Sequence, residues 1–339
     1  MIWSIQVLRF AAALMVVYLH ASFLAFRVTG SYGILPASLS ELGNAGVDIF
    51  FVISGLIIAK VAPGRAPHEF MLSRITRVVP LYFLFTIPSM LMQFGTSGFG
   101  WRNLLATFCF LPATDVVTLP ALHVGWTLCF EMLFYGCAAL VLLDRRFLVA
   151  LVAAYGVASL LRPAGAVFQF VGNPIILEFL FGVAIAFAPR NRLGIWALPC
   201  GIILLLAAGL TGTAPTAAPA LAADDGLRRV LVYGIPALLI VYGCLQIKAR
   251  ESRWTYLGEA SYSLYVSHIL LISPSFALWK MLHAPADLIV VACVGGALVL
   301  AWRTHELIEK PIARMLRRRE FRQRTPLEAD GTLSGANGG

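Results

Sequence analysis

The stretch IWSIQVLRFAAALMVVYLHASFLAF, residues 2–26, is apolar and long enough to cross a bilayer, which takes about 20 such residues. It also carries Arg9 and His20, and an ionisable side chain inside a membrane helix is costly. The two positions are 11 residues apart, so on a helix they share one face and lie roughly 16 Å apart along its axis. We therefore treat both as candidate site residues. The alternative is that Arg9 reaches the lipid headgroups and His20 is an ordinary interior histidine.

The composition is that of a polytopic membrane protein. Of the 339 residues 59% are hydrophobic and 13% are charged, whereas a soluble domain has about 25% charged residues. The net charge of +9 does not indicate nucleic-acid binding, because the Lys and Arg residues fall at the ends of apolar runs, as in cytoplasmic loops. The six cysteines form no CxxC pair, so we expect neither a disulfide framework nor a metal site. The N-terminus lacks the positive region of a secretory signal, and residues 2–26 are expected to be retained.

The predicted fold class is an all-α integral membrane protein with about ten transmembrane helices. The predicted spans are residues 3–26, 45–61, 78–94, 122–143, 147–161, 172–188, 193–210, 229–247, 261–281 and 286–303. The fifth is short, and a further apolar stretch at 104–111 is too short to span. With the N-terminus inside, 19 of the 26 Lys and Arg residues lie in the inward segments 60–77, 144–146, 190–192, 248–253 and 303 onward. The positive-inside rule therefore predicts that both termini are cytoplasmic.

The chain is expected to form one ten-helix membrane domain over residues 1–324. Residues 325–339 are rich in Gly and lack aromatic side chains, which predicts a disordered C-terminal tail. Residues 211–225, TGTAPTAAPALAADD, are expected to form an outward loop. We see no soluble catalytic module, so any chemistry must occur within or beside the helices.

Three acidic residues stand in apolar segments. Asp48 begins the second predicted span, where it is either the charge partner of a polar group on a neighbouring helix or a complement to the helix dipole. Glu131 lies roughly 13 Å inside the fourth span with no Lys or Arg nearby, so its partner comes from another helix or it is protonated. At a depth comparable with that of His20, it could prepare the imidazole as a general base. Glu178 is a further buried acid, either functional or structural.

Two arginines stand where a predicted cytoplasmic loop meets the third span. Arg74 and Arg77 are three residues apart and share a face on a helix, where two guanidinium groups can bind phosphate bidentately. The alternative is ordinary positive-inside charge. Pro80 is expected in the first turn of the helix that follows.

Small and polar residues mark two further helix faces. In the second predicted span, Gly46, Ser54 and Gly55 permit close approach of a neighbouring helix. In the ninth, a polar face is expected from Ser261, Tyr265 and His268, although His268 can equally be a structural histidine bonded to a neighbouring hydroxyl. The basic tail at 314–324 indicates a surface facing anionic lipid or phosphate.

Seven motifs, taken in order, resemble those of the acyltransferase family 3 membrane proteins, which O-acylate bacterial surface carbohydrates. They are Arg9 with ten residues before His20, GVDIFFVISG at 46–55, RITRVVPLY at 74–82, GWTLCFEMLFY at 125–135, EFLFG at 178–182, SYSLYVSH at 261–268 and EKP at 309–311. The motif at 125–135 is most similar to those of the exopolysaccharide acetyltransferases within the family. A departure from related enzymes is that no fused outward hydrolase-like domain is evident.

The resemblance implies acyl transfer from cytoplasmic acyl-coenzyme A, with acetyl-coenzyme A the expected donor, to a sugar hydroxyl at the outer face of a bacterial inner membrane. By this resemblance Arg9 and His20 match the arginine–histidine pair of the family, Arg74 and Arg77 its donor motif and Glu131 its buried acid. The residues expected to be catalytic are His20, Glu131 and Asp48, and those expected to bind the donor are Arg9, Arg74 and Arg77. Residues expected to support substrate or structure are Trp126, Tyr135, Glu178, Ser261 and His268.

In the expected mechanism the phosphates of coenzyme A dock at the arginines. His20, oriented by Glu131 or Asp48, then deprotonates the acceptor hydroxyl or itself carries the acyl group. The expected partners are a glycan or lipid-linked oligosaccharide acceptor, the lipid bilayer and the polysaccharide-synthesis machinery. The competing interpretation is a proton-coupled transporter or glycan exporter, because buried Arg, His and Glu also build proton relays. Against it, we detect no clear internal repeat; a purely structural scaffold would not explain Glu131.

Overall fold

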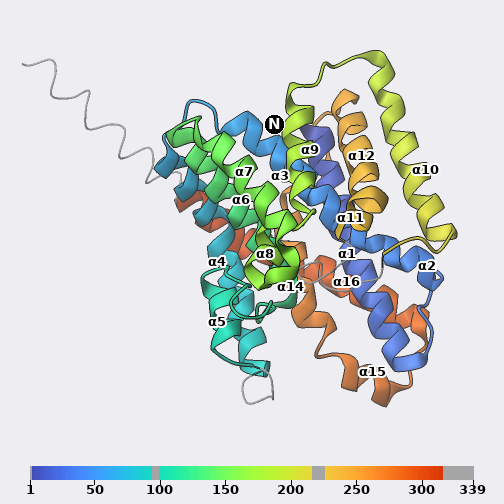
Figure 1. Cartoon of the computed structure of the whole chain (residues 1–339). Helices are drawn as coiled ribbons and strands as arrows, with labels where there is room; N and C mark the ends of the chain where they lie inside the picture. Colours follow the sequence, from blue (N-terminus) through green and yellow to red (C-terminus); the bar gives the residue numbers. More distant parts are fainter. Residues whose placement is uncertain (1, 94–98, 216–225, 316–339) are drawn as a thin grey trace, which may run out of the picture.

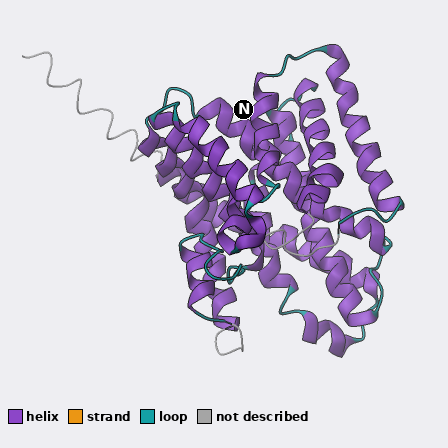
Figure 2. Ribbon diagram, viewed as in Figure 1, coloured by secondary structure: helices purple, strands orange, loops and turns teal. Residues whose placement is uncertain are grey.

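The computed structural model describes residues 2–93, 99–215 and 226–315, and all regular secondary structure in these ranges is helical (Figures 1 and 2). The prediction of an all-α protein is therefore confirmed for the described residues, where one isolated bridge pairs Ala113 with Val117. The predicted tail at 325–339 and most of the predicted loop at 211–225 lie outside the described residues.

The α-helices follow one another along the chain with short connections. They are α1 (Trp3–Thr29), α2 (Ala37–Ser40), α3 (Ala45–Val61), α4 (Pro67–Gln93), α5 (Trp101–Phe108), α6 (Trp126–Leu143), α7 (Phe147–Leu160), α8 (Ala166–Val171), α9 (Ile176–Phe187), α10 (Ala197–Leu210), α11 (Gly226–Arg229), α12 (Ile235–Gln246), α13 (Arg253–Glu259), α14 (Ser261–Ile272), α15 (Phe276–Leu282) and α16 (Ala286–Thr304). The 3₁₀-helices are η1 (Glu41–Asn44), η2 (His123–Gly125), η3 (Arg162–Ala164) and η4 (Arg192–Trp196), and η5 (Val230–Gly234) and η6 (His305–Glu309) are π-helical turns.

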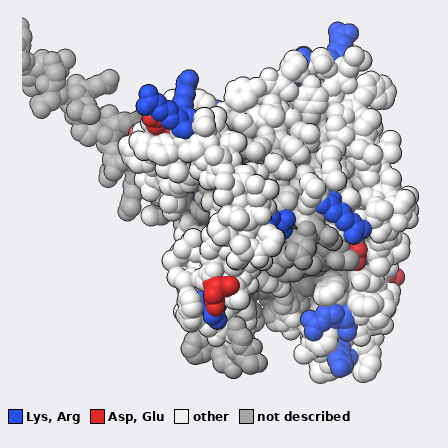
Figure 3. Space-filling model, in the orientation of Figure 1, with Lys and Arg blue, Asp and Glu red and all other residues white. Residues whose placement is uncertain are grey.

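Within the described residues, eight helical segments are long and apolar enough to cross a membrane. A ninth span arises if α14 and α15, bent by 54°, are taken as one, and α7 is a shorter apolar helix of 14 residues. Each of the ten predicted spans contains a helix, but the count of ten and the orientation of the termini stay predictions. Figure 3 shows a face on which charged side chains occupy only a few separate spots, as expected for a multi-pass membrane protein surrounded by lipid.

The helix that carries the two phosphate-binding candidates begins earlier than predicted. α4 begins at Pro67, where a proline fits the first turn, and the side chain of Phe70 is fully buried. Arg74 and Arg77 therefore lie on the helix and not in a loop at 60–77. The prediction that Pro80 occupies the first turn is wrong, because it lies inside α4.

The core is built around α1, which packs against α3, α13, α14 and α16 (Figure 1). Close approach between helices relies on small residues, as predicted. A Cβ atom on Gly46 would lie 2.3 Å from the carbonyl oxygen of Ala12 in α1, and one on Gly55 would lie 1.9 Å from that of Phe179 in α9. These contacts hold α3 tightly packed between α1 and α9. They therefore determine which side chains of α3 line the site.

Candidate active site

A cavity of about 90 Å³ lies among α1, α3, α4, α6 and α14 and contains three arginines. Its polar lining residues are Arg9, Ser54, Arg74, Arg77, Thr127, Glu131, Tyr135, Tyr262 and Tyr265, and we name it the arginine cavity. Arg9 is 8% exposed, and the buried Nε atom of Arg74 has no hydrogen-bond partner among the described residues. The arginines that the sequence places on two separate helices thus converge on one cavity.

The same three arginines also line a larger groove of about 450 Å³, which we name the basic groove. Its further charged or titratable lining residues are Arg65, Glu259, His305, Glu309 and Lys310. Arg and Lys outnumber Glu here by five to two, so the groove suits an anionic ligand. It adjoins the arginine cavity, since Arg9, Arg74 and Arg77 line both.

His20 lies in a third cavity of about 120 Å³, which we name the His20 cavity. It is lined by Val16, Leu19, His20, Asn44, Val47, His123, Val124, Trp126, Arg229 and Tyr265. Val47 and Tyr265 also line the arginine cavity, so the two cavities share a wall. Both Arg9 and His20 therefore face this series of cavities, as their shared helix face predicts.

The ring of His20 is held by two contacts. Its Nδ1 lies 2.8 Å from the carbonyl oxygen of Val16 on the preceding turn of α1. The same Nδ1 lies 3.4 Å from Nε2 of His268 on α14, and the two ring centroids are 5.0 Å apart. Because a carbonyl only accepts, Nδ1 carries the proton and Nε2 keeps its lone pair.

Glu131 does not orient His20. Its carboxylate accepts a hydrogen bond from Ser54 on α3 at 3.0 Å and another from Tyr135 on the next turn of α6. The prediction that its partner comes from another helix is confirmed. The expected contact with His20 is wrong, because Glu131 lines the arginine cavity and His20 lines the neighbouring one.

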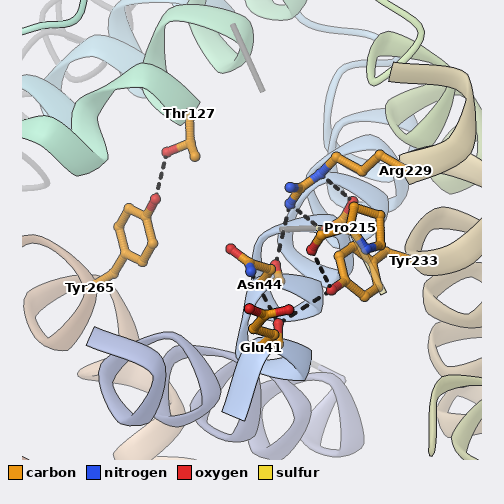
Figure 4. Close-up of polar contacts among 8 residues, drawn as sticks. Glu41, Asn44, Thr127, Pro215, Arg229, Tyr233 and Tyr265 are labelled. Carbon is orange, nitrogen blue, oxygen red and sulfur yellow. Dashed lines mark hydrogen bonds and ion pairs between the residues drawn. The ribbon is translucent and has the colours of Figure 1, made fainter. Parts of the chain in front are cut away.

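Asp48 forms a buried ion pair with Arg229, which stands at the start of the predicted span 229–247. Arg229 Nη2 lies 2.7 Å from Oδ2 of Asp48 and Arg229 Nε lies 3.0 Å from Oδ1, with 6% and 0% of the two side chains exposed. The same guanidinium donates to the carbonyl oxygen of Asn44 (Figure 4). Its centre lies 5.9 Å from the ring of Trp126. The charge-partner prediction for Asp48 is confirmed, whereas Asp48 does not hold His20.

Of the remaining candidates, Trp126 and Tyr135 line a cavity, whereas Glu178 and Ser261 line none of the three. Trp126 lines the His20 cavity and Tyr135 the arginine cavity. Glu178 is fully buried beside Asp48 and Arg229, and its Oε1 would lie 2.9 Å from a Cβ on Gly234. Ser261 is buried too, but its hydroxyl has no partner among the described residues.

Several residues that line the cavities were not predicted as site residues from the sequence. Two of them, Thr127 and Tyr265, form a pair of hydroxyls. The missed lining residues are His123, Thr127, Arg229 and Tyr262; Ser54 was marked only for helix packing and Tyr265 only as part of a polar face. Of these, Arg229 carried a signal, since like Asp48 it is a charge at the end of an apolar run. Within the described ranges no three His, Cys, Asp or Glu side chains lie together as a metal site would require.

The chain is similar in sequence to known acyltransferases and to a protein of exopolysaccharide production. The sequence model of an acyltransferase domain (Acyl_transf_3) matches residues 2–303. The chain is 32% identical over 303 residues to the Exopolysaccharide production protein ExoZ of Rhizobium meliloti (strain 1021), covering 82% of this chain and 92% of that protein. It is 26% identical over 370 aligned positions to the Acyltransferase MdmB of Streptomyces mycarofaciens, covering 93% of this chain and 92% of the relative. No solved structure matches the chain.

Proposed function

Because this chain belongs to the family of that acyltransferase domain and is an acyltransferase, we propose that it moves an acyl group from cytoplasmic acyl-coenzyme A to a glycan hydroxyl at the outer face of the inner membrane. The observation that carries the proposal is the series formed by the basic groove, the arginine cavity and the His20 cavity. The donor, which is anionic and long, enters at the basic groove. The acceptor enters at the His20 cavity. Acetyl is the acyl group that we propose.

The basic groove is the proposed docking site for the phosphates of the donor. Arg74 and Arg77 lie on one face of α4, and Arg9 approaches from α1. Guanidinium groups bind phosphate with two parallel charge-assisted hydrogen bonds. The Nε of Arg74, which has no partner among the residues that the structure describes, supplies a donor for one of them. Lys310 and Arg65 add charge at the entrance. This arrangement leaves the thin arm of the donor to pass through the arginine cavity.

His20 is the proposed general base. Its Nδ1–H donates to Val16 and faces His268, so Nε2 is the ring atom that can take the proton from the acceptor hydroxyl. Glu131 keeps a proposed role in the arginine cavity, where it offsets part of the charge of Arg9, Arg74 and Arg77. For Asp48 the proposed role is indirect, since it holds Arg229 in the wall of the His20 cavity.

The acceptor is proposed to be an exopolysaccharide, a lipopolysaccharide or a lipid-linked oligosaccharide. The relative from Rhizobium meliloti is a protein of exopolysaccharide production, and the family membership favours an enzyme over the transporter interpretation. A carbohydrate suits the His20 cavity, where the Trp126 ring and the polar groups of Asn44 and His123 line one space. The polysaccharide-synthesis machinery is the proposed partner that delivers it.

The experiment uses the purified full chain with labelled acetyl-coenzyme A and membrane glycan from cells that lack the gene. Labelled glycan is the expected product, and His20→Gln should abolish it because an amide cannot act as a base. His283→Gln is the matched control, since His283 is exposed and lines none of these cavities. Full transfer by His20→Gln would overturn the proposal. Label on the protein itself without acceptor would replace the base role of His20 with that of an acyl carrier.

A further inference from the structure

The wall between the arginine cavity and the His20 cavity is where the donor and acceptor of the proposed function must meet, and the inference below rests on that function. Two residues line both cavities, Val47 and Tyr265. Val47 offers only methyl groups, so Tyr265 is the residue of this shared wall that can donate a hydrogen bond. Tyr265 lines the His20 cavity together with His20, and its ring centroid lies 6.1 Å from that of His268, whose ring faces His20.

The Tyr265 hydroxyl is paired with a second hydroxyl from another helix. Its oxygen lies 2.9 Å from Oγ1 of Thr127 at the start of α6, and both belong to the arginine cavity (Figure 4). Thr127 donates to the carbonyl oxygen of Val124 at 3.0 Å, and Tyr265 lies 3.1 Å from the same oxygen. Two O–H donors therefore share one carbonyl acceptor. Either proton can turn to a new acceptor without leaving Val124 unpaired.

The other tyrosines of the arginine cavity are bonded elsewhere. Tyr262 donates to the carbonyl oxygen of Val78 at 2.8 Å, and Tyr135 donates to Glu131. Neither lines the His20 cavity. Tyr265 and Thr127 thus form a pair of buried hydroxyls, and one of their two protons is free to donate to a ligand. They lie where a thioester in the arginine cavity would approach His20.

We propose that the hydroxyls of Tyr265 and Thr127 stabilise the oxyanion that forms on the thioester carbonyl during acyl transfer. The lone pair of the acceptor oxygen forms the new C–O bond, and the carbonyl electrons move onto the carbonyl oxygen. The acceptor proton passes to Nε2 of His20. When the carbonyl re-forms, the C–S bond breaks, its electrons leave on sulfur, and His20 returns the proton to give the free thiol of coenzyme A. Hydroxyl donors fixed in a water-poor site are effective at this step because they need little reorientation.

The test compares Tyr265→Phe with Tyr242→Phe, which removes a hydroxyl that donates to the carbonyl oxygen of Pro189 at 2.7 Å and lines none of the three cavities. The expected result for Tyr265→Phe is a fall in kcat of about 100-fold or more, with unchanged affinity for a thioether analogue of acetyl-coenzyme A. Thr127→Val, which keeps the shape, should lower kcat in the same direction. The double variant should lose less than the product of the two losses, since the hydroxyls act as a unit. The kcat of Tyr242→Phe should stay within about threefold of that of the wild type.

Two results would overturn the inference. One is a Tyr265→Phe variant whose kcat equals that of Tyr242→Phe. The other is a variant that loses analogue affinity and thermal stability as much as kcat, which indicates a purely structural hydroxyl. If the wild-type protein itself transfers no acyl group, the proposed function is wrong. That result is distinct from the two above, which contradict only the role of the hydroxyls.

Discussion

His20 and His268 face each other across α1 and α14, with Nδ1 of the first 3.4 Å from Nε2 of the second. Each ring also places its Nδ1 against a carbonyl oxygen four residues earlier, that of Val16 for His20 and that of Leu264 for His268. Since carbonyl oxygens only accept, both neutral rings carry the proton on Nδ1. The lone pair on Nε2 of His268 therefore points at the Nδ1–H of His20, which leaves Nε2 of His20 for chemistry.

The first prediction concerns His268 as a positioning residue. His268→Leu removes the acceptor that faces His20, so kcat should fall about tenfold, while the KM for acyl-coenzyme A should not change because the basic groove is a separate site. His268→Gln should recover most of the activity, because its amide oxygen can accept in place of Nε2. Steady-state kinetics with both substrates measure this split. Equal kcat values for the Leu and Gln variants would contradict the positioning role.

The second prediction concerns the donor site. Arg74→Ala and Arg77→Ala should each weaken binding of acyl-coenzyme A about tenfold or more, since a charge-assisted hydrogen bond is worth about 1.5–3 kcal/mol. The glycan KM should stay unchanged. Binding of labelled donor to the purified variants is the measurement.

The matched controls for the donor site are Arg190→Ala and Arg192→Ala. They remove the same charge from a different groove, which also contains Lys248. Donor affinity in these controls should equal that of the wild type. Equal affinities for all four variants would rule out a phosphate role for Arg74 and Arg77.

The third prediction concerns the buried ion pair. Asp48→Leu and Arg229→Met should each destabilise the protein by about 3–5 kcal/mol, because each leaves one buried charge without its partner. The double variant should be more stable than either single one, since neither member of the pair is then left as a buried charge without its partner. Thermal unfolding in detergent compares the three. If the loss of unfolding free energy in the double variant equals the sum of the losses in the two single variants, the two residues do not depend on each other.

The fourth prediction concerns the crossing of α3 and α9. On Gly55 a Cβ would lie 1.9 Å from the carbonyl oxygen of Phe179, and on Gly182 it would lie 2.0 Å from that of Val52. Gly55→Ala and Gly182→Ala should therefore force the helices apart and cost about 1–3 kcal/mol or more. Gly136→Ala in α6 is the control, because a Cβ there meets open space and Ala favours the helix. Unfolding temperatures that fall equally in all three variants would contradict the close crossing.

The sequence by itself determined the helical membrane fold, because the length of an apolar run and the period of a helix are local properties. The same local geometry put Arg9 and His20 on one face of α1, and Arg74 and Arg77 on one face of α4. It misplaced the start of α4, since a polar segment that precedes an apolar run can be helical or a loop until its contacts are known, and here Phe70 is buried.

Only the tertiary structure decided which buried groups are partners. Asp48 pairs with Arg229, 181 residues away, and His20 meets His268, 248 residues away. Glu131 bonds Ser54 and Tyr135 in the arginine cavity instead of serving His20. A residue that needs a partner inside the membrane reveals that need in the sequence, because burial of a lone polar group is costly. Its partner depends on how distant helices pack, and that packing is set by contacts such as Gly55 against Phe179, which no single segment contains.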